Sequence, residues 1–340
     1  MAANPQSPLT PSPVHEQYHV YHAEAYILNG ELESPIKRKF EDYGRVSLEH
    51  TRSNSLITQS VGETNIEGLI SFKRGYTRVA GAYAQQKTDI YGQDHAGWQA
   101  LASAVLEGYN VEDILTVDRV VAQLSTQHPV IDGHVPRVNF FGSRFENLRI
   151  GGYPVEVELD LAFCGPKPDH DRTYLQDGGF LDRVHRQVDN ILDSDDLPDT
   201  LEEKYKAEIT TIDRLKENAR EMAKSGAAEN GNGYAKLRCS LVKEITFRSP
   251  HDGKPVKIPG VRTFGNAIFI GNFGTIYLAE LKVETKKSDG LIPHRIDDPP
   301  APQPRYSNHF SLEMVRLELG CPQSGNSNGG HVAGNGNTIP

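Results

Sequence analysis

The sequence has few of the residues that cross-link small secreted proteins or build metal sites from thiolates. Only three cysteines occur in 340 residues, Cys164, Cys239 and Cys321, and no Cys-x-x-Cys motif is present. An odd and sparse set argues against a disulfide framework. Cys164 and Cys321 both fall where a strand is predicted to end, so a bridge between them in an oxidising compartment stays an open alternative.

Basic clusters and long apolar runs are missing as well. The net charge is −9 and no Lys/Arg cluster could neutralise phosphates, which argues against nucleic-acid binding and against a polybasic membrane contact. No apolar run approaches the roughly 20 residues of a membrane-spanning helix, so no membrane insertion is expected. The polar, proline-rich start lacks the apolar segment of a secretory leader. This favours a cytoplasmic location, with leaderless export left open.

Low-complexity segments mark both ends of the chain. Residues 1–14 carry four prolines without hydrophobic periodicity, and residues 322–340 are rich in Gly, Asn and Ser. Such segments bury too little apolar surface to offset the entropy cost of ordering them. We therefore expect disordered tails at 1–14 and 322–340, on either side of one β-rich globular domain at 15–321.

Alternation with a period of two dominates this domain and is typical of half-buried strands. Four runs have these apolar members: Val155, Val157, Leu159, Leu161 and Phe163; Leu237, Cys239, Leu241, Ile245 and Phe247; Tyr277, Ala279, Leu281 and Val283; and Val315, Leu317 and Leu319. Gly151-Gly152 predicts a tight hairpin turn. Between Val117 and Val120 the apolar residues change from odd-numbered to even-numbered positions. Either a bulge or a strand covered on both faces explains this change. The sequence predicts a mainly β fold, an antiparallel sandwich or a partly closed barrel.

Residues 176–225 interrupt this pattern with helical periodicity. Apolar residues recur at intervals of three and four over 180–192 and again over 201–222, and Pro198 with an acidic turn at 193–196 separates the two runs. Asp199 and Glu202 have the spacing of a capping box. The sequence thus predicts an inserted αα-hairpin, and the apolar stripe of its second helix makes contact with a partner or with a second copy plausible.

One motif match points to zinc chemistry. His15-Glu16-Gln17-Tyr18-His19 fits H-E-x-x-H. On a helix the two histidines share a zinc ion, Glu16 serves as general base, and His22 extends the same face. However, proline-rich residues precede the match and a strand-like run follows it. We therefore interpret the match as accidental and expect no cofactor and no catalytic residue, with His15, His19 and His22 kept as the metal-ligand candidates.

A row of acids is the second candidate site. Glu156, Glu158 and Asp160 alternate with apolar residues along one predicted strand. Paired carboxylates serve glycosidases and also bind calcium. A row of acids at period two is equally typical of a solvent-facing strand, and this is the preferred interpretation.

Several stretches between Ala102 and Asp160 resemble a known theme. They are Ser103-Ala-Val-Leu-Glu-Gly-Tyr-Asn110, Leu115-Thr-Val-Asp-Arg-Val-Val-Ala-Gln123, Phe141-Gly-Ser-Arg-Phe-Glu-Asn-Leu-Arg-Ile150 and Gly152-Tyr-Pro-Val155. Together they resemble uncharacterised bacterial β-rich proteins, including the choice-of-anchor type of surface protein. The resemblance implies a β-rich fold and no established activity.

The preferred functional hypothesis is a soluble, acidic, non-enzymatic structural or binding protein of bacterial type. Its helical hairpin is the expected contact for a protein partner. Two alternatives remain: a zinc-dependent hydrolase using His15, Glu16 and His19, and a carbohydrate- or ligand-binding sandwich that uses the loops at one end.

Overall fold

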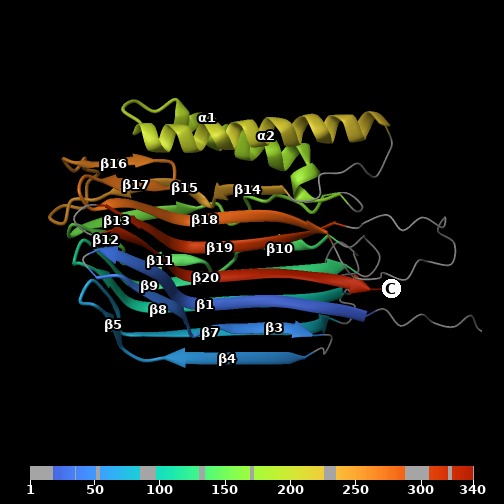
Figure 1. The fold of residues 1–340 in the computed structure, drawn as a ribbon, viewed down its shortest axis with the longest axis horizontal. Helices are drawn as coiled ribbons and strands as arrows, with labels where there is room; N and C mark the ends of the chain where they lie inside the picture. The colour runs from blue at the N-terminus through green and yellow to red at the C-terminus, as the bar shows by residue number, and fades with distance from the viewer. Residues whose placement is uncertain are drawn as a thin grey trace, which may run out of the picture.

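Two antiparallel sheets pack face to face, and a pair of helices lies along one edge (Figure 1). The computed structural model describes residues 18–34, 36–50, 54–84, 97–129, 135–168, 172–225, 235–287, 306–320 and 324–339. Neither sheet closes on itself within these residues. The predicted antiparallel sandwich with an inserted helical hairpin is therefore confirmed. The predicted disordered tail at 1–14 lies outside the described residues.

The first sheet has nine strands and brings the two ends of the chain together. Its order is β16 (Val261–Phe264), β17 (Ala267–Ile270), β18 (Gly274–Lys287), β19 (Tyr306–Leu319), β20 (Ser324–Ile339), β1 (Tyr18–Ser34) and β2 (Arg38–Tyr43). In addition, β14 (Ala235–Ser240) pairs with β18, and β3 (Val46–His50) pairs with β1.

The second sheet has eleven strands. Its order is β15 (Val242–Phe247), β13 (Tyr153–Leu159), β12 (Arg149–Ile150), β9 (Leu115–Pro129), β8 (Gly97–Val111), β6 (Ile70–Phe72) and β5 (Thr64–Ile66). Off this path, β10 (Arg137–Asn139) and β11 (Arg144–Glu146) pair with β9, β7 (Arg74–Ala84) pairs with β8, and β4 (Ser55–Val61) pairs with β7. Gly151 and Gly152, both at positive φ, form the predicted turn between β12 and β13.

The predicted disordered tail at 322–340 is wrong for most of its length. Ser324–Ile339 forms β20, which lies inside the nine-stranded sheet and pairs with β19 on one side and β1 on the other. Ladder hydrogen bonds on both edges compensate for the few apolar side chains. Small residues are needed where the two sheets approach: a Cβ at Gly334 would lie 2.4 Å from Leu124 Cδ2 of the opposite sheet. A composition that indicates disorder is therefore also one that fits a crowded central strand.

The run predicted as one strand over 237–247 divides between the two sheets. β14 pairs with β18 in the first sheet and β15 pairs with β13 in the second. Between them, Leu241 donates its N–H to Ala279 O at 3.0 Å and accepts from Asp160 N at 2.7 Å. Lys243 interrupts the alternation of apolar residues in this run. The crossing explains this interruption, because the chain changes sheets just before Lys243.

A line of interrupted pairing crosses the first sheet. In four neighbouring strands one residue is left out of the register at this line: Ala279, Met314, Gly330 and Ile27. At this line the alternation shifts by one residue, so that odd-numbered residues face the core on one side of it and even-numbered residues on the other. In β8 and β9 the same interruption occurs at Gly108 and Asp118, and it accounts for the parity change between Val117 and Val120.

The helical insertion is α1 (Gly178–Leu192) and α2 (Asp199–Ser225), preceded by the short 3₁₀ helix η1 (Tyr174–Gln176). The Asp177 carboxylate accepts from Phe180 N at 2.7 Å and caps α1. The apolar stripes of both helices pack into the common core: Phe180, Leu181, Val184, Val188 and Ile191 from α1, and Leu201, Tyr205, Ile212 and Leu215 from α2. Contact with a partner through the hairpin stays a prediction, and it would use the charged outer side.

Neither α1 nor α2 is long and apolar enough to cross a membrane, and the same holds for every helix in the described segments.

Cys164 and Cys239 are buried free thiols, and burial raises the pKa of Cys164 to about 12. Cys321, the other member of the possible bridge to Cys164, lies outside the described residues.

Candidate functional site

The two described histidines of the zinc candidate set, His19 and His22, do not share a face. His15 and Glu16 lie outside the described residues, whereas His19 and His22 lie on β1 rather than on a helix. His19 faces the core, stacked on Trp98 with a centroid distance of 5.3 Å, and burial lowers its pKa to about 3. His22 faces outward, with its Nδ1 3.4 Å from Glu49 Oε1. His19 and His22 therefore point to opposite faces of a strand and lack the common face on which two histidines bind one zinc ion.

The acids of β13 lie in solvent, as the preferred interpretation predicted. Glu156 pairs with Arg248 at 2.7 Å and Glu158 pairs with Lys243 at 2.5 Å, all on the surface. Exposed pairs of this kind contribute little to stability. Across the described ranges, no group of three or more His, Cys, Asp or Glu side chains is placed to hold a metal ion.

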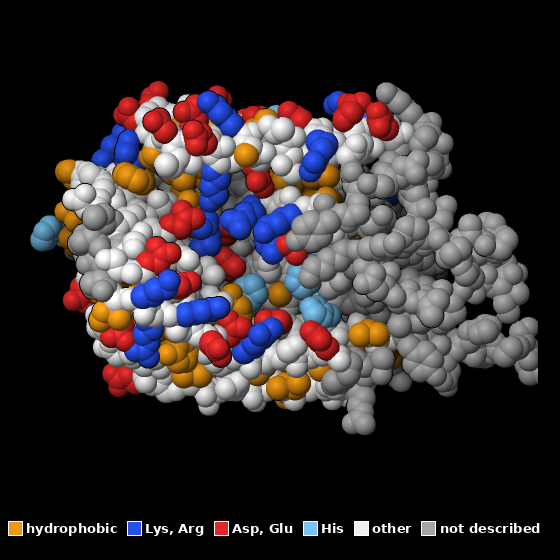
Figure 2. Space-filling model, in the orientation of Figure 1, with side chains coloured by type: hydrophobic (Ala, Val, Ile, Leu, Met, Phe, Trp, Pro, Cys, Tyr) orange, Lys and Arg blue, Asp and Glu red, His pale blue; other side chains and the backbone are white. Residues whose placement is uncertain are grey.

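The outer face of the nine-stranded sheet carries the polar side chains that the sequence patterns did not single out. Residues directly opposite each other in an antiparallel pair point to the same face. Tyr277 lies opposite Arg316, Arg316 opposite Asn328, and Asn328 opposite Asn29. These four form one row across β18, β19, β20 and β1, which we call the amide row. Figure 2 shows this face, on which basic and acidic side chains lie close together.

Hydrogen bonds hold the β1 end of the amide row in place. Asn328 Nδ2 donates to Asn29 Oδ1 at 3.1 Å, and Asn29 Nδ2 donates to Asp42 Oδ1 at 2.8 Å. Arg45 then joins Asp42 Oδ2 at 3.3 Å and Glu24 Oε1 at 3.1 Å. This chain of bonds, together with a side-chain hydrogen bond between Asn29 and Tyr26, orients each amide, so that Asn328 Oδ1 is left to accept a hydrogen bond from a ligand.

An open groove of about 610 Å³ lies over this end of the row, on β20, β1 and β2. Its lining is Asn29, Gly30, Glu31, Lys39, Phe40, Glu41, Asp42, Arg45, Asn326 and Asn328. Three carboxylates and two basic groups leave the lining close to neutral. Phe40 is the one aromatic side chain among them and is itself buried. The lining is more polar than apolar, so the groove can offer many hydrogen bonds.

The other end of the amide row meets the helical hairpin in a buried ion network. Arg316 Nε donates to Glu280 Oε2 at 2.5 Å and its guanidinium also pairs with Glu318. Tyr277 donates its hydroxyl to Glu318 Oε2 at 3.0 Å, and the Arg316 guanidinium lies 3.8 Å from the centre of the Tyr277 ring. These contacts fix the row from both sides, so its side chains are preorganised.

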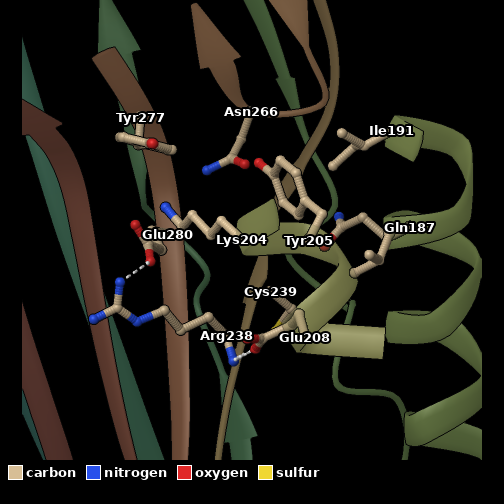
Figure 3. A pocket seen from close by; sticks show the side chains of 11 residues that line it. Gln187, Ile191, Lys204, Tyr205, Glu208, Arg238, Cys239, Asn266, Tyr277 and Glu280 are labelled. Atoms are coloured by element: carbon tan, nitrogen blue, oxygen red, sulfur yellow. Dashed lines mark hydrogen bonds and ion pairs between the residues drawn. The ribbon is translucent and has the colours of Figure 1, made fainter. Parts of the chain in front are cut away.

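Lys204 of α2 enters the same network through a small cavity beneath the hairpin (Figure 3). The cavity is about 30 Å³, enough for a water molecule but not for a larger ligand. Lys204 Nζ lies 3.9 Å from the centre of the Tyr277 ring. Burial, and then the positive charge of Arg316, lower the pKa of Lys204 to about 8. The Glu208 carboxylate accepts from Arg238 N at 2.6 Å, and its burial raises its pKa.

Lys204 gives a testable pH dependence. Between about pH 8 and its ordinary pKa of 10.5, the unfolded chain holds a proton on Lys204 that the folded protein has released. The contribution of Lys204 to stability therefore rises with pH across this window, by an amount on the order of 2–3 kcal/mol for a shift of this size, whereas the buried thiols of Cys164 and Cys239 contribute in the opposite direction. Lys204→Met keeps the length of the side chain without the charge, so this rise is expected to disappear. Urea unfolding of both proteins from pH 7 to 10 measures the difference, and parallel curves would contradict the placement of Lys204.

The sequence patterns missed the amide row because its members come from four strands far apart in the chain. Asn29 and Asn328 are 299 residues apart. The one local signal is Asn326 and Asn328, which alternate with Gly325, Ser327 and Gly329 as amides on one face of a strand would. Without knowledge that residues 324–339 form a strand, this alternation has no meaning.

Comparison with known proteins identifies a family but no activity. No curated protein and no solved structure matches the chain. A family model described as a domain of unknown function (DUF8256) matches residues 19–284, from β1 into β18. The match includes both helices and the whole eleven-stranded sheet and covers well over half of the chain. The chain therefore belongs to the family described as a domain of unknown function (DUF8256).

Proposed function

We propose that the protein is a non-enzymatic binding protein whose ligand lies in the groove over β20, β1 and β2. The observation that carries this proposal is the groove itself, about 610 Å³ of open space above amides already oriented by hydrogen bonds. Its volume falls within the range typical of small-molecule sites. Preorganised side chains lose little entropy when a ligand binds, so the network favours binding as well as stability.

A neutral saccharide is the class of ligand that fits this lining best. Sugar hydroxyl groups both donate and accept hydrogen bonds, and Asn29, Asn326 and Asn328 provide donors and acceptors side by side. The nearly balanced charge of the lining favours neither an anion nor a cation. The mainly polar lining, in which the one aromatic side chain is buried, favours a polar ligand over a lipid. The carbohydrate-binding alternative is therefore proposed in a changed form, with the sheet face in place of the end loops.

A glycan array followed by titration calorimetry tests the proposal. We expect one class of neutral glycan to bind, and Asn29→Ala or Asn328→Ala to weaken this binding by about tenfold each, as the loss of one or two hydrogen bonds implies. Asn190→Ala is the matched control, because Asn190 is an exposed asparagine on α1, away from the groove. If no glycan binds, or if binding survives both groove variants, the proposal is wrong.

A further inference from the structure

The edge strand β4 differs from every other edge of the sandwich. Ser55–Val61 pairs with β7 in an unbroken register, from Ser55 opposite Gly81 to Val61 opposite Gly75, without a bulge. No strand among the described residues pairs with its other edge. In Figure 1, β4 lies at the edge of the molecule opposite to the helices. The five residues from 56 to 60 are all exposed, and these include Leu56 at 58% and Ile57 at 36%.

Exposed edges normally carry charged residues, prolines or bulges that prevent pairing with another chain. Five other edge strands follow this rule within the described segments: Arg38, Lys39, Glu41 and Asp42 in β2, Glu49 in β3, Lys236 and Arg238 in β14, Lys243 and Glu244 in β15, and Arg262 in β16. The remaining edges, β5, β10 and β11, are three residues long. In contrast, β4 has seven residues with neither charge nor proline. The usual protection against edge pairing is therefore missing at one place.

We infer that β4 pairs with β4 of a second copy of this chain and joins the two eleven-stranded sheets into one. Full overlap of 55–61 in an antiparallel pair places the two-fold axis at Thr58. Thr58 then faces its own counterpart, Ile57 faces Gln59, and Leu56 faces Ser60. Threonine pairs of this kind are favourable, and no like charges meet. Among the edge strands longer than three residues in the described ranges, β4 is the one with neither charge nor proline, so the arrangement is specific to β4.

A second copy suits this edge better than an unrelated protein does. A two-fold axis uses the same strand twice, so β4 needs no complementary sequence elsewhere. Leu56 lies opposite Ala80 and Ile57 opposite Val79, so the two large apolar side chains lie on opposite faces of the sheet. In the dimer, Leu56 can cover β4 of the second copy on one face of the joined sheet, and Ile57 can cover it on the other face. The shared surface is seven residues per chain, below the standard interface size, so the dimer should depend on concentration with a dissociation constant of roughly micromolar order.

Sedimentation velocity on the full chain, from about 1 µM to about 1 mM, tests the inference. The wild-type protein is expected to shift from monomer to dimer over this range. Thr58→Lys places two ammonium groups opposite each other at the axis, so this variant is expected to stay monomeric with an unchanged circular dichroism spectrum. Ser47→Lys is the control, because it adds the same charge at an exposed position of another edge strand, β3, and should leave the dimer intact.

If Thr58→Lys fails to fold, Ile57→Lys provides the same test one residue away. A wild-type chain that is monomeric throughout overturns the inference. So does a dimer that persists in a folded lysine variant, or one that Ser47→Lys dissolves, because either result places the contact elsewhere. These outcomes are independent of glycan binding, since the groove lies on the other sheet.

Discussion

Removal of residues 324–340 is expected to abolish cooperative folding. Without β20, the facing edges of β1 and β19 lose their partner in the middle of the nine-stranded sheet. Fifteen residues of β1 and nine of β19 would then lose their partners in β20, and backbone groups left unpaired cost free energy when they are buried. Differential scanning calorimetry should show no cooperative transition, and the near-ultraviolet circular dichroism should be lost. A truncated protein with the transition of the full chain would contradict the placement of β20.

A single substitution provides a graded version of this test. Gly334→Ala places a methyl group 2.4 Å from Leu124 Cδ2 in the opposite sheet, and overpacking of this kind costs about 1–3 kcal/mol. Gly62→Ala is the matched control, because no heavy atom lies within 4 Å of the added carbon. Equal midpoints of urea unfolding for the two variants would mean that β20 does not pack against β9.

Deletion of the helical hairpin, residues 178–225, behind a short Gly/Ser linker is expected to give an insoluble protein. The buried faces of α1 and α2 belong to the common core, and their loss would expose the apolar side chains on which they pack. Phe180 has no exposed surface and contacts the Phe163 and Tyr174 rings edge-on. Phe180→Ala should therefore lower the free energy of unfolding by about 3–5 kcal/mol, as measured by urea denaturation.

The outer side of the hairpin provides the control for this prediction. Glu203 and Lys206 are exposed on α2, so their joint replacement by alanine should change stability by less than about 0.5 kcal/mol. A soluble, folded deletion variant would show instead that the hairpin is peripheral and that the β core is complete without it.

Secondary structure could be predicted from the sequence where local chemistry and tertiary packing agree. The helices begin and end close to the predicted residues, because Pro198 and the acidic turn interrupt two clear stripes. The turn at Gly151 and Gly152 is likewise set by local backbone preference. In these segments the tertiary environment adds stability without changing the local preference.

Prediction failed where neighbouring strands decide whether a segment forms a strand, and in which sheet. Strand propensity depends strongly on position in a sheet, and β20 forms because β1 and β19 saturate both of its edges, not because Ser324-Gly-Asn-Ser favours extended backbone. The division of 237–247 at Leu241 has the same origin, since one period-two pattern runs through two strands that pair in different sheets. The groove could not be predicted for the same reason, because Asn328 lies beside Asn29 only when residues 324–339 form a strand.

The pairing of β1 with β20 also sets an order of events in folding. The two strands contact each other over nearly their full length, although almost 300 residues of chain lie between them. Closing so long a loop adds little to the free-energy cost, since that cost grows only with the logarithm of loop length, but contacts of this range slow folding. During synthesis β1 emerges well before the strand that completes its sheet. Its long edge is thus open to wrong partners for most of translation, and expression at low temperature or with a chaperone should raise the yield of native protein.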